Sequence, residues 1–373
     1  MRNVRVLAVP LLAAGLVAGI APAASAAAAR TGPARQAAAY SVKGRLSGVA
    51  ATSARNAWAV GSTGEISTKT LIVHWNGTTW RRVPSPSPAD SVLVRVAATS
   101  ARNAWAVGYA NTIKGQPLIL HWNGTAWKQV GSPHLADGGI LYGVAAVSAT
   151  SAWAVGSTSG SSSRTLIEHW NGTAWKRVSS PTAAGGVLLN GVAATSARNA
   201  WAVGFAFETF KTVILRWNGT SWKRVSSPTP SAGASQTGVA AASATSAWTV
   251  GTTGDCGCGP GNTLGLRWNG HSWKRVSSPG GLGGALLAGV AAAPSRKAWA
   301  VGFTGCGCGP GTPPIKTLIV AWTGTAWKRT AHPDTQRGSL AAVAVTSSRN
   351  AWAVGSTDSG KTLILRWNGK FWK

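Results

Sequence analysis

Short runs of alternating apolar and polar residues, separated by turn-forming residues, recur along most of the chain. This alternation has the period of two that is typical of half-buried β-strands. In the first clear unit it predicts four strands, at residues 46–51, 57–61, 70–75 and 79–83. A polar turn separates the first two strands, a polar loop precedes the third, and Pro84 follows the fourth.

The unit occurs seven times. Ala-Trp, followed by Ala or Thr, then Val-Gly, marks each copy, and successive copies lie 47 to 53 residues apart. All 21 tryptophans belong to the pattern, three in each copy, with the second and third always five residues apart. Most of the length variation lies between the second and third strands. A period of this size is the signature of a repeat architecture.

Four antiparallel strands in about 48 residues match one blade of a β-propeller, and seven copies lie within the usual range of about four to eight blades. We therefore predict an all-β, seven-bladed β-propeller of four-stranded antiparallel blades. Copy 7 ends with a short fourth strand, and residues 40–43 are the nearest segment that could add a strand beside it. The predicted blades are residues 46–84, 92–131, 139–179, 187–226, 235–277, 284–330 and 338–373.

The first tryptophan of each copy is interpreted as packing between blades. In the second strand, Trp58 and Val60 point to one side, whereas Ala57, Ala59 and Gly61 point to the other. A large face can then meet a small face of the neighbouring blade, and large apolar residues are usually buried. The alternative is that some tryptophans near the third-to-fourth turn stack on sugars. The predicted inter-blade residues are Trp58, Trp105, Trp153, Trp201, Trp248, Trp299 and Trp352.

The third-to-fourth turn contains Asn76-Gly77, a pair that suits a type I′ turn. With its flanking residues, the unit Asn-Ala-Trp-Ala-Val-Gly … Thr-Leu-Ile-x-His-Trp-Asn-Gly-Thr-x-Trp resembles the tryptophan-rich repeats of secreted actinobacterial β-propellers. These are distantly similar to BNR/Asp-box and photosystem II assembly factor-like propellers. The resemblance covers residues 46–373, and it implies the fold much more than an activity. The segment from Asn76 to Trp80 is one residue shorter than an Asp box and has Asn in place of Asp.

The beginning of the chain has the features of a secretory signal. A basic start, an apolar run over residues 6–23 and the small-residue site Ala24-Ser25-Ala26 predict a signal peptide at 1–26. We expect residues 27–45 to be a flexible N-terminal segment and the mature protein to be secreted or associated with the cell wall. No later apolar run approaches the roughly 18 residues of a membrane span, so no transmembrane segment is expected in the mature chain.

The net charge is strongly positive. The 36 basic and 8 acidic residues give +28, and removing Arg2 and Arg5 with the signal peptide leaves +26. Such a charge attracts polyanions without giving specificity. We therefore expect a monomeric, non-catalytic binding module for an anionic polymer or carbohydrate, with no specific nucleic-acid recognition. A neutral-sugar lectin, a scaffold for a protein partner and an enzyme with an unrecognised site are the alternatives.

The loops between the second and third strands differ most, and variable loops on a fixed scaffold are the usual place for binding. A basic residue ends this loop in six copies, and copy 5 has Asn262 there. The alternative for these residues is a solvated surface charge that aids solubility. A second basic set on the fourth strands is best explained as protection of sheet edges. The predicted ligand-binding residues are Lys69, Lys114, Arg164, Lys211, Lys316 and Lys361.

Two Cys-Gly-Cys-Gly-Pro-Gly segments occupy these loops in copies 5 and 6. An even number of cysteines in an exported protein favours disulfides, in one of three pairings. A zinc site is the alternative, although zinc ligands usually follow Cys-x₂₋₄-Cys spacing. The disulfide candidates are Cys256, Cys258, Cys306 and Cys308.

Enzymatic function finds little support in the sequence. The acidic residues are scattered, and no recurring pair suits glycoside hydrolysis, which needs two carboxyl groups beside the bond. His74, His121 and His169 occupy the same third-strand position in three copies, too far apart to share a metal. No cofactor signature is present, and we predict no catalytic residues, no metal and no cofactor.

Overall fold

The structure is a computed structural model that describes residues 40–111, 115–160, 163–254, 261–281, 283–293, 297–305, 313–333 and 337–373. These residues form seven antiparallel sheets in chain order, which we call blades 1 to 7. The predicted fold class is thus confirmed.

Each blade takes consecutive strands of the chain. Blade 1 contains β1 (Arg45–Ser53), β2 (Asn56–Thr63), β3 (Lys69–Trp75) and β4 (Trp80–Arg82). Blade 2 contains β5 (Val92–Ser100), β6 (Asn103–Ala110), β7 (Gln116–Trp122) and β8 (Trp127–Val130). Blade 3 contains β9 (Gly139–Ser148), β10 (Ser151–Thr158), β11 (Thr165–Trp170) and β12 (Trp175–Arg177). Blade 4 contains β13 (Val187–Ser196), β14 (Asn199–Ala206), β15 (Thr212–Trp217) and β16 (Trp222–Arg224).

The remaining blades follow the same order. Blade 5 contains β17 (Ala234–Ser243), β18 (Ser246–Thr253), β19 (Thr263–Trp268) and β20 (Trp273–Val276). Blade 6 contains β21 (Ala285–Ala292), β22 (Ala298–Thr304), β23 (Lys316–Trp322) and β24 (Trp327–Arg329). Blade 7 contains β25 (Gly338–Ser347), β26 (Asn350–Thr357) and β27 (Thr362–Trp367). Its fourth strand is reduced to a bridge between Trp367 and Trp372.

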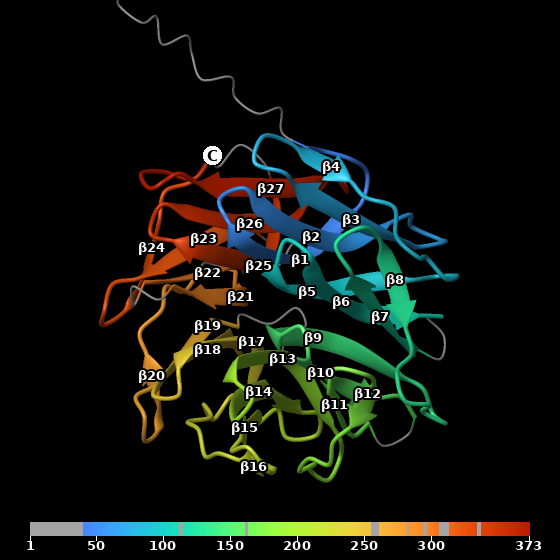
Figure 1. Ribbon diagram of the computed structural model, residues 1–373. Helices are drawn as coiled ribbons and strands as arrows, with labels where there is room; N and C mark the ends of the chain where they lie inside the picture. The colour runs from blue at the N-terminus through green and yellow to red at the C-terminus, as the bar shows by residue number, and fades with distance from the viewer. Residues whose placement is uncertain are drawn as a thin grey trace, which may run out of the picture. The chain divides into compact units, whose positions relative to one another are not determined.

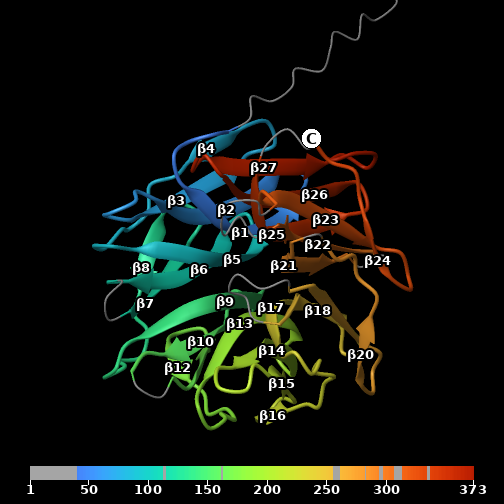
Figure 2. The ribbon, with the colours of Figure 1, turned by 180° about the vertical axis from the view of Figure 1, so that it is seen from behind.

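The blades follow one another around a ring, with the first strand of each blade nearest the centre (Figures 1 and 2). Each first strand contacts the first strands of the two neighbouring blades, and β1 contacts both β5 and β25. Blade 1, drawn in blue, and blade 7, drawn in red, therefore lie side by side (Figure 1). The ring closes between these two blades.

The second strands are buried along almost their entire length, because neighbouring blades cover both of their faces. The glycine of each second strand is required by the shape of the neighbouring first strand. In β1 the register shifts between Leu46 and Gly48, which is a β-bulge. A methyl group on Gly61 would then lie only 1.9 Å from the carbonyl oxygen of Arg45. The same bulge and glycine recur in every blade, so the Gly of Ala-Trp-Ala-Val-Gly accommodates the bulge.

Three tryptophans meet at every interface between blades. The second-strand Trp58 of blade 1 lies 4.8 Å from Trp122 and 5.1 Å from Trp127 of blade 2, measured between ring centroids. The ring of Trp127 is perpendicular to that of Trp58, an arrangement that aromatic quadrupoles favour. At the closing interface, Trp352 of blade 7 makes the same contacts with Trp75 and Trp80 of blade 1, at 4.9 and 5.0 Å.

The large-against-small packing is visible in the core clusters. Trp58 and Val60 belong to the cluster shared with blade 2, whereas Ala57 and Ala59 belong to the cluster shared with blade 7. The structure places the predicted inter-blade tryptophans at these interfaces, with side chains that are 0–7% exposed: Trp58, Trp105, Trp153, Trp201, Trp248, Trp299 and Trp352.

The expected type I′ turn at Asn76-Gly77 is wrong. Gly77 has a φ of 102°, but Asn76 does not have a positive φ, and Trp75 pairs with Trp80 across a four-residue loop. The Asn76 side-chain oxygen accepts hydrogen bonds from the backbone amides of Thr78 and Thr79, both at 3.0 Å. Asn is therefore selected as a turn-forming acceptor rather than for a left-handed backbone.

Candidate functional site

The propeller has two faces of different construction. The loops between second and third strands lie on one face with the connections between blades; a backbone hydrogen bond of 3.2 Å from Asn111 to Ala89 joins one of each. We call this the loop face. The turns between first and second strands, and between third and fourth strands, form the opposite face, which we call the turn face.

The predicted ligand-binding residues of the described chain all lie on the loop face, at or directly before the start of a third strand, one in each of five blades. Their side chains are exposed: Lys69, Arg164, Lys211, Lys316 and Lys361. Lys114 lies outside the described residues. The structure thus distributes these cations around the ring and does not gather them into one pocket.

The loop face also carries acidic residues. Five of the six described Asp and Glu side chains lie in its loops and connections: Glu65, Asp90, Asp137, Glu208 and Asp358. The loop face is therefore mixed in charge. The strand order assigns each acidic residue to a face, because each loop or turn lies on one known face of the ring.

The turn face has the opposite character. Exposed basic residues occupy its first-to-second turns in five blades: Arg55, Arg102, Arg198, Lys297 and Arg349. Lys370 adds another cation on the last turn. No Asp or Glu of the described chain lies on this face. In the sequence the acidic residues are scattered and are not assigned to faces, so this separation of charge was not predicted.

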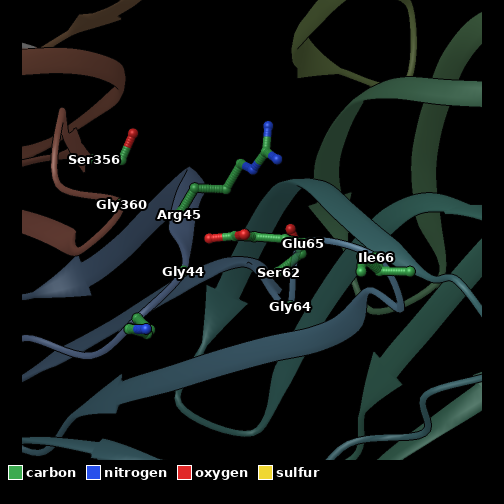
Figure 3. Close-up of a pocket in the computed structure, with 9 residues that line it drawn as sticks. Gly44, Arg45, Ser62, Gly64, Glu65, Ile66, Ser356 and Gly360 are labelled. Atoms are coloured by element: carbon green, nitrogen blue, oxygen red, sulfur yellow. The ribbon is translucent and has the colours of Figure 1, made fainter.

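A pocket of about 560 Å³ opens on the loop face where blades 7 and 1 meet. Lys43, Arg45 and Glu65 line it together with Ser356 and other residues. The Arg45 and Glu65 side chains lie beside one another in the pocket, and Ile66 lies farther out on the same loop (Figure 3). The pocket therefore offers charges of both signs.

The first strands of all seven blades line a central channel with a cavity of about 130 Å³. Six blades have a Gly or Ala at the same position of this wall, but blade 2 has Arg95. The Arg95 guanidinium donates hydrogen bonds to the carbonyl oxygens of Ser47 in blade 1 and Ala288 in blade 6. Burial lowers the pKa of Arg95 to about 10. This single arginine links three blades across the channel.

Glu168 is the second exception to the repeat. It lies on β11, where the other blades have Val or Leu, and its side chain is fully buried against blade 2. Ser132 donates a hydrogen bond of 2.8 Å to one carboxyl oxygen, while the other oxygen has no partner within the described residues. Burial raises the pKa of Glu168 to about 7. Aligning the seven copies would have identified both Arg95 and Glu168 as exceptions.

The third-strand His or Arg residues interact with the tryptophan clusters. His74 stacks on Trp58 at 4.1 Å, and its Nε2 lies 2.8 Å from the Asn56 side-chain oxygen. Burial lowers the pKa of His74, and that of His121 and His169 in the same way. In blade 7, Arg366 lies 5.0 Å over Trp352. These side chains cover the indoles and bind a neighbouring turn, which is a packing role.

The indoles themselves offer little free surface. Trp75 donates its indole N–H to the carbonyl of Ala54 at 3.0 Å, which fixes the third-strand tryptophan on its own turn. None of the 21 tryptophans, all of which the structure describes, is an exposed side chain. The exposed large apolar residues are Ile66, Phe207, Phe210 and Phe371.

The four disulfide candidates, Cys256, Cys258, Cys306 and Cys308, lie outside the described residues. Among the residues that are described, no group of three or more His, Cys, Asp or Glu side chains could hold a metal ion. Within the same residues, no helix has the length and apolar character to cross a membrane.

A scan against protein-family models and a search of curated proteins gave no match. Solved structures do match the fold. A structure of YCF48 bound to D1 peptide is 16% identical, with a TM-score of 0.57, and the match covers 88% of this chain and 96% of that chain. YCF48 from Cyanidioschyzon merolae is 18% identical, with a TM-score of 0.57 and coverages of 87% and 96%. At such identity the likeness concerns the fold alone: this chain is a tryptophan-rich, seven-bladed β-propeller structurally similar to YCF48.

Proposed function

We propose that this protein is an exported, non-catalytic binding module for an anionic polymer of the cell envelope or its surroundings. The observation that carries the proposal is the net charge of +26 expected for the chain without residues 1–26, together with the exposed Lys and Arg side chains on both faces of the ring. Export rests on the signal-like residues 1–26. A monomer suffices, because the repeated cations already surround one ring.

The polar groups of the described chain support a non-catalytic role. The carboxyl group with the strongly raised pKa, Glu168, is sealed between blades 2 and 3 and has no access to a substrate. The three histidines of the third strands are engaged by tryptophans and by neighbouring turns. The remaining described acidic residues are spread over five different loops and connections.

The proposal is tested by binding of residues 27–373 to purified cell wall, before and after removal of its anionic polymers, across a salt series. We expect removal, or about 0.5 M salt, to abolish binding, because polyanion contacts release counterions and are screened by salt. Binding that survives both treatments would refute the proposal.

The second candidate is a protein partner. A structurally similar propeller, YCF48, has been solved with a bound peptide, and the pocket between blades 7 and 1 offers charges of both signs. Binding to a neutral sugar is less well supported, because such sites rely on exposed aromatic rings and no tryptophan of this chain is exposed. Wall binding that resists salt and is lost after protease treatment of the wall would favour the protein partner.

A further inference from the structure

The two faces of the ring differ in the sign of their charges. The loop face combines cations with five described carboxylates, whereas the turn face carries cations and no described Asp or Glu. The electrostatic potentials of charges of one sign add together over a surface, whereas those of opposite charges partly cancel at a distance. A long polyanion therefore experiences the stronger attraction at the turn face, although the loops of the other face are longer.

The turn-face arginines are also held in place. A methyl group built on Gly77 would lie 3.2 Å from both Cβ and Cγ of Arg55, which shows that the arginine stem lies over the adjacent third-to-fourth turn. Three further blades repeat this contact, in the pairs Arg102 with Gly124, Arg198 with Gly219 and Arg349 with Gly369. A stem held by packing loses less conformational entropy when its head group binds a ligand.

The head groups of these four arginines are available. Their side chains are exposed, and none of them donates a side-chain hydrogen bond or forms an ion pair within the described residues. In these four blades the first-to-second turn contacts the third-to-fourth turn, which leads into the fourth strand. Exposed basic residues such as Arg81 and Lys223 lie on that strand. The cations thus recur from blade to blade around the ring.

The residue types favour phosphate. Guanidinium groups bind phosphate and carboxylate oxygens through two parallel hydrogen bonds, and they are the preferred side chains for phosphate recognition. A membrane-binding face would combine its cations with several inserted apolar side chains. On the turn face, Phe371 is the exposed large apolar residue of the described chain, whereas Ile66, Phe207 and Phe210 lie on the loop face. A linear polymer fits this surface better than a membrane.

We infer that the turn face is the docking surface for a linear phosphodiester polymer, which runs around the ring across Arg55, Arg102, Arg198 and Arg349. This inference rests on the proposed function and names the surface and the ligand chemistry.

The repeat supplies matched variants for the test. Copies 3 and 5 have Thr150 and Thr245 at the turn-face arginine position, so the fold already accepts threonine there. The turn variant replaces Arg55, Arg102, Arg198 and Arg349 by Thr. Copy 5 has Asn262 at the loop-face position, so the loop variant replaces Lys69, Arg164, Lys211 and Lys361 by Asn. Each variant loses four positive charges, the turn variant from the turn face and the loop variant from the loop face.

Binding of each protein to poly(glycerol phosphate) would be measured by titration calorimetry from low to high salt. We expect the turn variant to bind roughly ten-fold or more weakly, with a salt slope that is shallower by about 3, because up to four phosphate contacts are lost. The loop variant should lose less affinity than the turn variant at every salt concentration. Unfolding temperatures and near-ultraviolet spectra of both variants check that the ring is intact.

The opposite ranking, with the loop variant weaker, would overturn the inference while leaving the proposed function standing. A parent protein that binds no anionic polymer would refute the proposed function itself. Polygalacturonate and phosphatidylglycerol vesicles serve as further probes. Equal or tighter binding to polygalacturonate would overturn the phosphate assignment, and equal or tighter binding to the vesicles would overturn the linear polymer.

Discussion

The closing interface between blades 7 and 1 differs from the other six in how it is held, but not in its central packing. Three tryptophans meet at each of the seven interfaces, and six interfaces repeat the perpendicular contact of the second-strand tryptophan. At the interface of blades 5 and 6, Trp248 clusters with Trp322 and Trp327 and lies 6.3 Å from Trp322. At every interface except the closing one, the chain passes directly from one blade to the next. At the seventh, opposite ends of the described chain meet, and hydrogen bonds and packing replace the covalent connection.

One backbone hydrogen bond of the connections between blades has an equivalent at the closing interface. The amide before β5, that of Ser91, donates to the carbonyl of Thr68 before the third strand of blade 1, at 3.0 Å. The equivalent bond at the closing interface runs from Gly44 to Gly360 at 2.8 Å. Residues 40–44 thus occupy the place that the connections between blades take elsewhere.

Residues 40–43 do not act as the fourth strand of blade 7. Lys43 forms an isolated bridge with Lys361, and Val42 exchanges hydrogen bonds with Thr362 at the start of β27. The fourth-strand position is taken by Trp372 and Lys373, and Lys373 pairs with Arg366 through two backbone bonds of 2.8 and 3.0 Å. Closure of the ring therefore depends on the segment before the first blade as well as on the last blade.

The largest effect is expected from removing an interface tryptophan. Trp105→Ala and Trp352→Ala should each lower the free energy of unfolding by about 3–5 kcal/mol, the usual cost of truncating a buried Trp. Trp105 lies at a covalently connected interface and Trp352 at the closing one, and each contacts two tryptophans of the next blade. His121 covers Trp105, whereas Arg366 covers Trp352. Denaturant unfolding of both variants measures the difference. A much smaller loss for Trp352→Ala would show that the closing interface contributes little.

The next effect concerns the interface between blades 2 and 3, where Glu168 replaces an aliphatic residue. The folded-state pKa of Glu168 is raised from 4.5 to about 7, so the folded protein retains its proton over this range. The contribution of Glu168 to the free energy of unfolding is therefore most favourable below pH 4.5, falls as the pH rises from 4.5 to 7, and reaches its full penalty above pH 7.

Glu168→Leu should remove this penalty. The pKa difference corresponds to a gain of about 3 kcal/mol in unfolding free energy at pH 8, and the gain should shrink toward pH 4. Leu215→Glu introduces the same group at the equivalent position of blade 4 and should lower stability at pH 8. A gain for Glu168→Leu that does not change with pH would contradict the assignment of the titrating group.

The smallest effect is expected from shortening the segment that completes the closing interface. A chain that begins at Arg45 loses three hydrogen bonds made by Val42 and Gly44, and the packing of Tyr40 and Val42 on the closing cluster. We expect a net loss of about 2 kcal/mol in unfolding free energy. Each of the three bonds contributes roughly 1 kcal/mol, and the conformational entropy lost when residues 40–44 become ordered offsets part of this sum. A chain that begins at Tyr40 is the matched control and should keep the stability of residues 27–373. Equal stability of the two shortened chains would show that residues 40–44 do not hold the ring.

The sequence permits prediction of the repeated part of the molecule. Trp58, Val60 and Gly61 recur at fixed spacing, and a period of two decides which side chains share a face without any long-range information. The turn at Asn76 was assigned incorrectly because a two-residue and a four-residue loop share the same Asn-Gly signal. The pairing of Trp75 with Trp80, which distinguishes the two, is a property of the folded hairpin.

The blade can be predicted from the sequence alone, with its four strands, their order and their sevenfold repetition, because these depend on patterns among near neighbours in the chain. Features that depend on residues from different blades become apparent only in the folded ring. The tertiary structure placed Arg95 across the channel to Ala288, buried Glu168 against Ser132, and brought Val42 to Thr362. The physical reason is that burial, charge separation and closure arise from groups that become neighbours only when the ring forms.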